Sequence, residues 1–307
     1  MNAASTFYKR PWKDLFTLLF ILICCVLITS IVFGALRLLI FEHQDINSNF
    51  SSEDSGARYF TYLMLAASSM STFLLPALFF QKYDQSQQIF PQEHITDWKN
   101  YFLSILFLLA IAPCMSLVST WNMQMSLPEF FAGVEEWMRY KENQAAALTA
   151  SMVMQTDFES LLINIIVLGI LPAIGEEFFF RGALQHIIFR FFKDKHISIW
   201  IVALIFSAIH FQFFGFFPRM LLGVFFGYVL LWTSNIWAAV FSHFVNNTMV
   251  VIMAFMYARQ GKDYADLMEA DSYSNIAYLG SFVGSMLIAY VFYLYTIRKK
   301  QHGKRVD

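Results

Sequence analysis

The sequence predicts an all-α fold, a polytopic integral membrane helical bundle with about eight transmembrane helices. Of the 307 residues, 58% are hydrophobic and only 14% are charged, whereas about a quarter of the residues in soluble domains carry a charge. The apolar residues gather in runs of about 20, the length that a helix needs to cross a hydrocarbon core of about 30 Å. We see no internal repeat and no soluble domain, so one domain is expected.

Eight apolar runs are the predicted transmembrane helices. They cover residues 15–36, 59–80, 101–121, 161–180, 197–217, 220–233, 236–257 and 276–297. The first run follows basic residues, as in a secretory signal, but it is too long for one and no small-residue cleavage site follows it. We therefore expect a cytoplasmic segment at 1–14, a single transmembrane domain at 15–297 and a basic cytoplasmic tail at 298–307.

The fourth and sixth runs depart from the standard length. Apolar residues continue past the fourth run to Phe192, which exceeds the thickness of a bilayer, so this helix must bend, break or leave the membrane. Pro172 is the expected kink, because proline lacks the backbone donor and clashes with the preceding turn. The sixth run is short, so it is expected to begin earlier, to tilt or to pack inside the bundle.

The charges between the runs predict the orientation, because short cytoplasmic loops are enriched in lysine and arginine. Thirteen basic residues fall on one side: Lys9, Arg10, Lys13, Lys82, Lys99, Arg190, Lys193, Lys195, Arg298, Lys299, Lys300, Lys304 and Arg305. The acidic residues fall on the other: Glu42, Asp45, Glu53, Asp54, Glu129, Glu135, Glu136, Asp263, Asp266, Glu269 and Asp271. We therefore predict a multi-pass protein of the cell membrane with both termini cytoplasmic.

Residues 122–159 form the one long polar insertion. Its apolar residues recur at helical spacing: Phe130, Phe131, Val134, Trp137 and Met138. This pattern is typical of an amphipathic helix that lies on the outer membrane surface, and a short cap over the bundle is the alternative. Cys24, Cys25 and Cys114 lie inside apolar runs without paired spacing, which argues against a disulfide framework and against a zinc ribbon.

Two adjacent carboxylates, Glu176 and Glu177, interrupt the fourth apolar run, and Arg181 follows them. Ionisable groups in a bilayer cost several kcal/mol unless they are paired or hydrated, so they mark function by default. Glu177 and Arg181 are four residues apart and can meet on one helix face, while Glu176 points elsewhere and is free to act on a water. A purely structural pair that ties helices together is the alternative.

Further polar residues stand in later apolar runs. His210 lies in the fifth run, and a single intramembrane histidine is often a core residue bonded to a carbonyl. His243 and Asn247 are four residues apart in the seventh run and share one face, from which they can donate to a developing oxyanion. Asn246 is turned away from that face and suits helix packing.

The three clusters together resemble the motifs EExxxR, FxxxH and HxxxN of the CPBP family. The matching residues are Glu176-Glu177-Phe-Phe-Phe-Arg181, Phe206-Ser-Ala-Ile-His210 and His243-Phe-Val-Asn-Asn247. This family comprises the type II CAAX prenyl endopeptidases and the bacteriocin-processing or immunity proteins, also called the Abi family. The set of motifs is complete and in order, although each motif alone is weak. The rest of the chain resembles membrane helices in general.

The resemblance implies an intramembrane endopeptidase, with its catalytic core at about 160–257. Glu176 and His210 would activate a water, His243 and Asn247 would stabilise the oxyanion, and Glu177 and Arg181 would support them. No metal or other cofactor is expected, because the sequence has no H-E-x-x-H pair. A catalytic zinc bound by Glu176, His210 and His243 stays open as the alternative.

The expected partners are a hydrophobic or lipidated peptide substrate and membrane lipids, and no nucleic acid. Two other functions compete with the enzyme: a non-catalytic membrane scaffold or bacteriocin self-immunity protein, and a proton-coupled transporter. A scaffold has no evident use for all six polar residues. The transporter is disfavoured because the sequence contains no inverted repeat.

Overall fold

The computed structural model describes residues 11–40, 55–84, 88–92, 97–268 and 273–303, and in these residues it contains helices and no strand. The α-helices are α1 (Pro11–Ile40), α2 (Ser55–Ser69), α3 (Leu75–Tyr83), α4 (Trp98–Met123), α5 (Ala132–Val153), α6 (Phe158–Asn164), α7 (Leu171–Glu177), α8 (Gln185–Phe192), α9 (Lys195–Ala208), α10 (Phe216–Thr233), α11 (Ile236–Arg259), α12 (Tyr264–Met268) and α13 (Asn275–Gly303). Three π-helical segments, η1 (Met70–Leu74), η3 (Ile165–Ile170) and η4 (Phe178–Leu184), and two 3₁₀ turns, η2 (Glu129–Phe131) and η5 (Phe213–Gly215), complete the path.

Within the described residues, seven helical stretches are long and apolar enough to cross a membrane, and α9 is a shorter apolar helix. The predicted all-α, multi-pass membrane bundle is therefore confirmed. The prediction of one continuous helix over 197–217 is wrong, because α9 ends at Ala208 and the chain turns through η5 into α10. The sixth predicted helix begins earlier than its apolar run, at Phe216.

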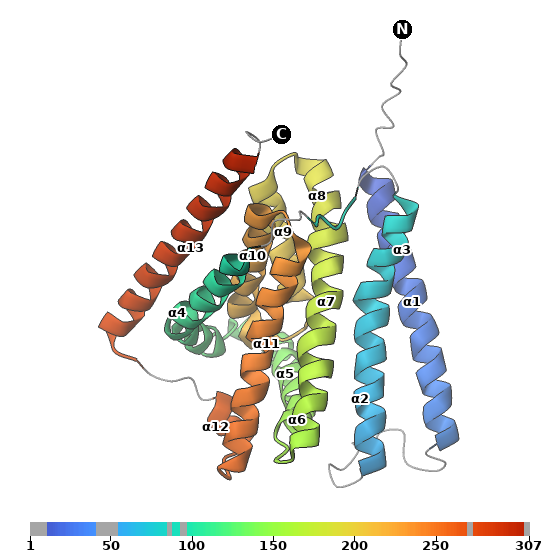
Figure 1. Cartoon of the computed structure of the whole chain (residues 1–307). Coiled ribbons are helices and arrows are strands. Elements are labelled where there is room, and N and C mark those ends of the chain that lie inside the picture. The colour runs from blue at the N-terminus through green and yellow to red at the C-terminus, as the bar shows by residue number, and fades with distance from the viewer. Residues whose placement is uncertain (1–10, 41–54, 85–87, 93–96, 269–272, 304–307) are drawn as a thin grey trace.

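The helices run alternately up and down, and the start of α1 and the end of α13 lie at the same end of the bundle (Figure 1). Arg190 of α8 bonds there to Asp14 of α1 and, at 2.5 Å, to Asp84 just after α3. At the start of α4, the Lys99 ammonium lies 5.5 Å from the ring centre of Tyr295 of α13. Basic residues that the sequence predicted on one side therefore belong to helix ends at one end of the bundle.

Several residues used for the orientation prediction lie outside the described part of the chain. They are Lys9, Arg10, Lys304 and Arg305 on the predicted cytoplasmic side and Glu42, Asp45, Glu53, Asp54, Glu269 and Asp271 on the other. The side of the membrane that each end faces stays a prediction.

The long stretch Phe158–Phe192 is one helical rod of 35 residues. It does not break at Pro172 but widens into π-helical turns, η3 just before this proline and η4 just after Glu177. The same arrangement occurs between α2 and α3. The π-helical segment η1 directly precedes α3, and α3 contains Pro76. A wider turn is a known response to a missing i→i−4 bond, and π-helical turns occur often at functional sites.

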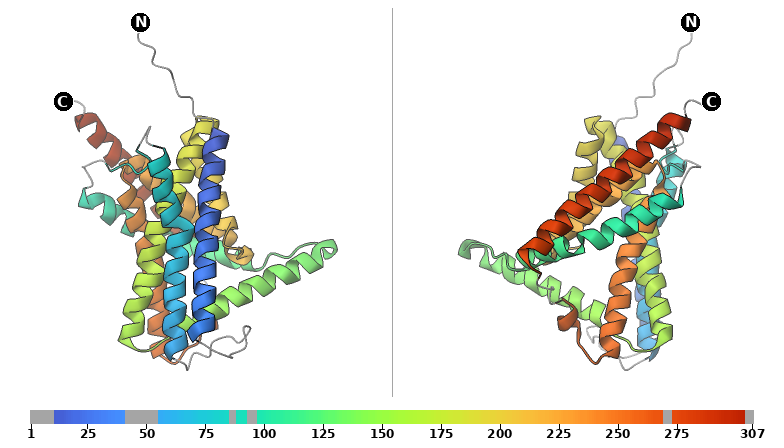
Figure 2. Two further views of the ribbon diagram at one scale, coloured as in Figure 1. Left: turned by 90° about the vertical axis from the view of Figure 1, so that its right-hand side faces the viewer. Right: turned by 60° about the vertical axis from the view of Figure 1, so that its left-hand side comes forward.

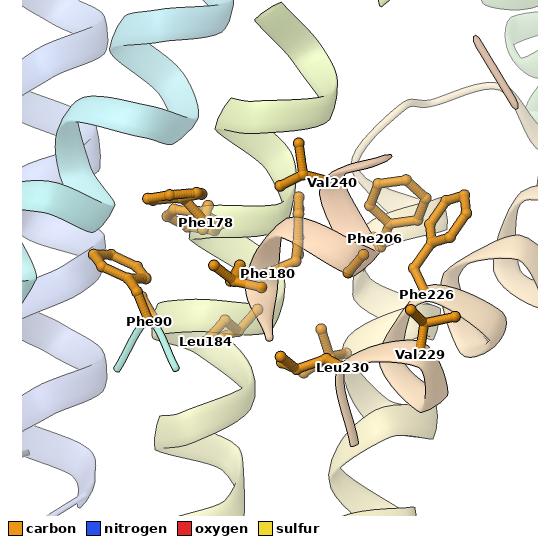
Figure 3. Close-up of a cluster of buried hydrophobic side chains, with 14 of the residues drawn as sticks. Phe90, Phe178, Phe180, Leu184, Phe206, Phe226, Val229, Leu230 and Val240 are labelled. Carbon is orange, nitrogen blue, oxygen red and sulfur yellow. The ribbon is translucent and has the colours of Figure 1, made fainter. Parts of the chain in front are cut away.

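An aromatic core fills the middle of the bundle, between η4, α10 and α11 (Figure 3). Phe178 packs on Phe90 at 4.6 Å between ring centres, and Phe180 meets the edge of Phe206 at 5.1 Å. Phe90 comes from the segment 88–92, which returns into the bundle between α3 and α4. Of these rings, Phe206 lies beside the Arg181 guanidinium and the rings of His210 and His243.

Helix α5 projects obliquely from the bundle, as both views in Figure 2 show. Its apolar side chains Val134 and Trp137 are exposed at 48% and 44%, and Phe131 of the preceding turn η2 at 47%. Acidic and basic residues such as Glu135 and Arg139 pair on the same helix at 2.7 Å. A helix is thus present in the polar insertion, and its placement on the outer membrane surface stays a prediction.

Gly182 is expected to tolerate no side chain. A Cβ at this position would lie 2.5 and 2.6 Å from two ring carbons of Phe90, whose ring is held against Phe178. Gly182→Ala should therefore lower the unfolding free energy by about 1–3 kcal/mol through overpacking. Gly280→Ala is the matched control, because nothing lies within 4 Å of its Cβ. Thermal unfolding in detergent measures both, and equal midpoints would contradict the steric argument.

Candidate active site

The predicted site residues come from three neighbouring parts of the bundle. Glu176 and Glu177 end α7, Arg181 lies in η4, His210 stands on the turn after α9, and His243 and Asn247 lie on α11. Helix α11 packs directly against η3 and α7, and α9 packs against η4 and α10. Residues up to 71 positions apart, such as Glu176 and Asn247, are therefore brought to one region of the bundle.

Glu177 is the centre of a buried polar triad. Its Oε1 lies 2.9 Å from Nη1 of Arg181 and 2.8 Å from Nδ1 of His243, and its side chain is 0% exposed. The pair with Arg181 follows from the four-residue spacing. The bond with His243 joins α7 to α11 and was not predicted from the sequence, which indicated His243 only as an oxyanion donor. Glu177 therefore orients His243, a predicted catalytic side chain, in addition to pairing with Arg181.

Arg181 is held on several sides at once. Its Nη2 donates to the Gly223 carbonyl of α10 at 2.9 Å. The guanidinium lies 4.8 Å from the ring centre of Phe206 and 5.5 Å from that of Phe226. A buried cation is tolerable when a carboxylate and aromatic faces replace its water. Arg181 therefore joins α9, α10 and the EExxxR helix around Glu177.

His243 has both its ring plane and its tautomer fixed. The ring stacks on Phe226 at 4.8 Å with an interplanar angle of 14°. Because a carboxylate accepts, Nδ1 carries the proton that is donated to Glu177. Nε2 then points the other way and lies 3.8 Å from Oε2 of Glu176. Two atoms at this separation can both hydrogen-bond a single water at about 2.8 Å from each.

His210 stands on irregular backbone rather than on a helix. Phe211, the next residue, has a φ of 52°, in the left-handed region. Nδ1 of His210 lies 2.7 Å from the Phe206 carbonyl, and because a carbonyl only accepts, Nδ1 carries the proton and Nε2 is free. Phe206 also contacts the ring of His243, at 6.0 Å between centres, and that of His210, at 5.2 Å. The two histidines therefore flank one phenylalanine, each with Nε2 available.

The side chain of Asn247 is anchored to a backbone carbonyl that Pro172 leaves without its usual helical donor. Proline has no N–H to give to the carbonyl four residues before it, which is that of Leu168. Nδ2 of Asn247 donates to this carbonyl at 3.3 Å. Asn246 donates to Oδ1 of Asn247 at 3.2 Å. The side chain expected to bind an oxyanion thus makes two bonds within the protein, and one N–H of its amide remains for a ligand.

The suggested zinc ligands do not form a common site. In the described part of the chain, no three histidine, cysteine, aspartate or glutamate side chains are grouped closely enough to hold a metal ion. Glu176 and His243 form a pair, and because Nδ1 of each histidine is bonded within the protein, Nε2 is the one nitrogen of each ring that could face a metal. The arrangement of Glu176, His210 and His243 therefore does not fit the zinc site that the sequence left open.

Arg219 is a site residue that the sequence analysis missed. It is the one charged residue in α10 and donates to the backbone and side-chain oxygens of Gln212, at 3.2 and 2.7 Å. Its charge acts on Glu176 and on Glu142 of α5. Glu142 in turn accepts a bond from the Phe214 amide at 3.3 Å. The signal in the sequence was an arginine between two apolar runs.

The acidity of Glu142 provides a pH-dependent prediction. Burial raises the pKa of Glu142 above its usual value of 4.5, against the opposing effects of the Phe214 amide and the Arg219 charge. The folded state thus binds this proton more tightly than the unfolded state, so stability declines as pH rises from about 4.3 through the raised pKa. Glu142→Gln should remove this decline and be at least as stable as wild type at pH 7.

Thermal unfolding midpoints from pH 4 to pH 8, in detergent, measure the effect. The difference between Glu142→Gln and wild type should grow with pH and then level off. Glu136→Gln, at an exposed position of the same helix, is the control and should follow wild type. A Glu142→Gln protein that loses stability on raising the pH as much as wild type would contradict the buried location.

Comparison with known proteins supports the motif assignment. Residues 158–249 match the family model described as type II CAAX prenyl endopeptidase Rce1-like. The uncharacterized protein YpbD of Bacillus subtilis (strain 168) is 30% identical over 104 residues, which are 32% of this chain and 50% of that relative. The chain thus matches about half the length of this relative. No solved structure matches the chain.

The matched residues run from the start of α6 into α11 and contain all six motif residues. They form the part of the bundle in which the triad, the two histidines and Asn247 come together. The family match and the motif geometry, which are independent observations, therefore concern the same segment. Over residues 158–249, which hold the whole candidate site, the chain is therefore similar to the type II CAAX prenyl endopeptidase Rce1-like family model.

Proposed function

We propose that the protein is an intramembrane endopeptidase that hydrolyses a peptide bond in a hydrophobic or membrane-associated peptide. The single observation that carries the proposal is the placement of Glu176 beside His243, whose other nitrogen is held by the Glu177–Arg181 pair. A carboxylate beside an oriented imidazole is the arrangement that general-base catalysis requires. The family match supports the same reaction class.

In the proposed reaction, Glu176 takes a proton from a water and the resulting hydroxide attacks the scissile carbonyl. His210, whose Nε2 is free, assists by accepting from the same water. The tetrahedral oxyanion receives hydrogen bonds from Asn247 and from His243, which keeps its proton on Nδ1 and takes a second proton from solvent on Nε2. Glu176 then returns its proton to the leaving amine, so that one water is consumed and one carboxylic acid and one amine are formed.

A membrane-associated substrate is proposed because of where the site lies. The motif residues are surrounded by buried aromatic and aliphatic side chains on helices that can cross a bilayer. A peptide that reaches them must therefore be hydrophobic itself or carry a hydrophobic group. We further propose that the protein resides in the cell membrane with both termini cytoplasmic, as the basic residues at one end of the bundle favour.

The test is cleavage by the purified protein reconstituted in lipid vesicles. A library of hydrophobic peptides is incubated with wild type and with Glu176→Gln, and the products are identified by mass spectrometry. Glu159→Gln is the matched control, since Glu159 is an exposed carboxylate of the same rod and accepts a bond from Tyr59 at 2.9 Å. Products formed by wild type and Glu159→Gln, but not by Glu176→Gln, support the proposal. Equal products from all three proteins would refute it.

A further inference from the structure

We infer that Asn122, at the end of α4, is a positioning residue for His210 and acts through the turn that joins α9 to α10. The inference rests on the proposed function, because it assigns a role in that reaction to a helix that carries none of the motif residues. Asn122 is 2% exposed and is separated from the turn by about 90 residues of sequence.

The turn needs such a partner because it is irregular backbone among membrane helices. Helix α9 stops at Ala208, Phe211 has a positive φ, and α10 begins only at Phe216. Backbone N–H and C=O groups outside regular helices must find partners in the protein, since the hydrocarbon offers none. His210 stands on this turn, so the order of the turn decides where its Nε2 points.

Asn122 supplies two of these partners from one side chain. Its Nδ2 donates to the Phe213 carbonyl at 3.0 Å, and its Oδ1 accepts from the Phe217 amide at 2.9 Å. The two bonds bracket η5 and satisfy one of the unpaired amides at the start of α10. An amide is the one short side chain that donates and accepts in this way. Asn122 therefore clamps the turn on both sides.

Other side chains complete the frame but are less specific. Ser207 donates to the Phe216 carbonyl at 2.6 Å, Arg219 donates to Gln212, and Glu142 accepts from the Phe214 amide. Arg219 also acts electrostatically on Glu176, so its replacement would change more than the turn. Asn122 is neutral and contacts no motif residue. A variant at Asn122 therefore tests the position of His210 without altering the charges of the site.

Asn122→Leu removes both bonds at nearly constant volume, Asn122→Gln keeps an amide that is one methylene longer, and Asn122→Ala serves if the leucine variant does not fold. Asn164→Leu is the matched control, because Asn164 is also 2% exposed and donates to the Met152 carbonyl at 2.7 Å, away from the turn. Each protein is assayed for kcat and KM at temperatures below its unfolding midpoint. Amide hydrogen exchange of the peptide 209–217 is measured by mass spectrometry.

In Asn122→Leu, the rate of amide hydrogen exchange in the peptide 209–217 should rise by about tenfold or more. The kcat should fall on the order of 10²-fold, as expected when a catalytic group is misplaced by about 1 Å, with KM within about twofold of wild type. Asn122→Gln should be intermediate. Asn164→Leu should lose thermal stability but keep its kcat and its exchange at 209–217.

Unchanged exchange at 209–217, or faster exchange with unchanged kcat, would overturn the inference. An equal kcat loss in Asn164→Leu would overturn it too, because the effect would then belong to stability in general. If wild type cleaves no peptide but Asn122→Leu still exchanges faster than wild type at 209–217, the proposed function would be refuted and the clamp on the turn would be established. The two failures are therefore distinguishable.

Discussion

Replacing Glu176 by glutamine is expected to lower kcat for peptide cleavage by on the order of 10²- to 10⁴-fold, the usual contribution of a general base. Glutamine cannot accept the proton of the attacking water or return it to the leaving amine. The KM should change little, since the amide keeps the shape of the side chain. Single-turnover and steady-state rates on one defined peptide, in lipid vesicles, measure the loss.

The same substitution is expected to leave the fold intact. Among the described residues, no hydrogen bond to Glu176 is formed, and the ionisable group that lies within 4 Å of it is His243, with Nε2 at 3.8 Å. Removing a charge from an apolar site relieves a desolvation cost. The unfolding midpoint should therefore equal or exceed that of wild type. Wild-type turnover in Glu176→Gln would exclude Glu176 as the base, and a collapsed midpoint would show that the carboxylate has a structural role instead.

Replacing Arg181 by methionine is expected to have the largest effect on stability, a loss of about 3–5 kcal/mol in the free energy of unfolding. Glu177 is 0% exposed and bonds to both Arg181 and His243. Without the guanidinium, a buried carboxylate loses its charged partner and Gly223 loses a donor. Equilibrium unfolding in a mixed detergent system measures the difference from wild type.

A double variant separates the lost pair from the lost packing. Glu177→Gln combined with Arg181→Met removes both charges, so much of the stability should return, because a neutral replacement of a buried ion pair often costs little. Activity should not return, since His243 is no longer held by a carboxylate at Nδ1. If the Arg181→Met protein were as stable as wild type, the stabilising role assigned to the buried triad would be contradicted.

The two predictions test different functions of adjacent carboxylates. Glu176 should affect the rate and spare the fold, whereas Arg181 and its partner Glu177 should affect the fold first. The sequence suggested this division from the direction of the two side chains on a helix. The structure adds that Glu177 also orients His243, so replacement of Glu177 alone should affect both properties.

Local features of the sequence predicted most of the helices. The apolar run 236–257 corresponds to α11, Ile236–Arg259, and the run 101–121 lies within α4, Trp98–Met123. The prediction for the run 197–217 was wrong, because the turn at 209–215 still contains large apolar residues such as Phe211 and Phe213 and so continues the apolar pattern. Hydropathy cannot reveal a turn whose backbone is satisfied by Asn122 and Arg219 from elsewhere.

The sequence by itself determined that the chain forms apolar membrane helices and carries three ordered polar motifs. Both are local properties: helical hydrogen bonds join residues four apart, and burial in lipid depends on each run of side chains. Only the tertiary structure decided that His243 bonds to Glu177, that Asn247 takes the carbonyl left by Pro172, and that His210 stands on a turn. These contacts join residues far apart in sequence, so they depend on how α4, α7, α10 and α11 pack, which no single segment encodes.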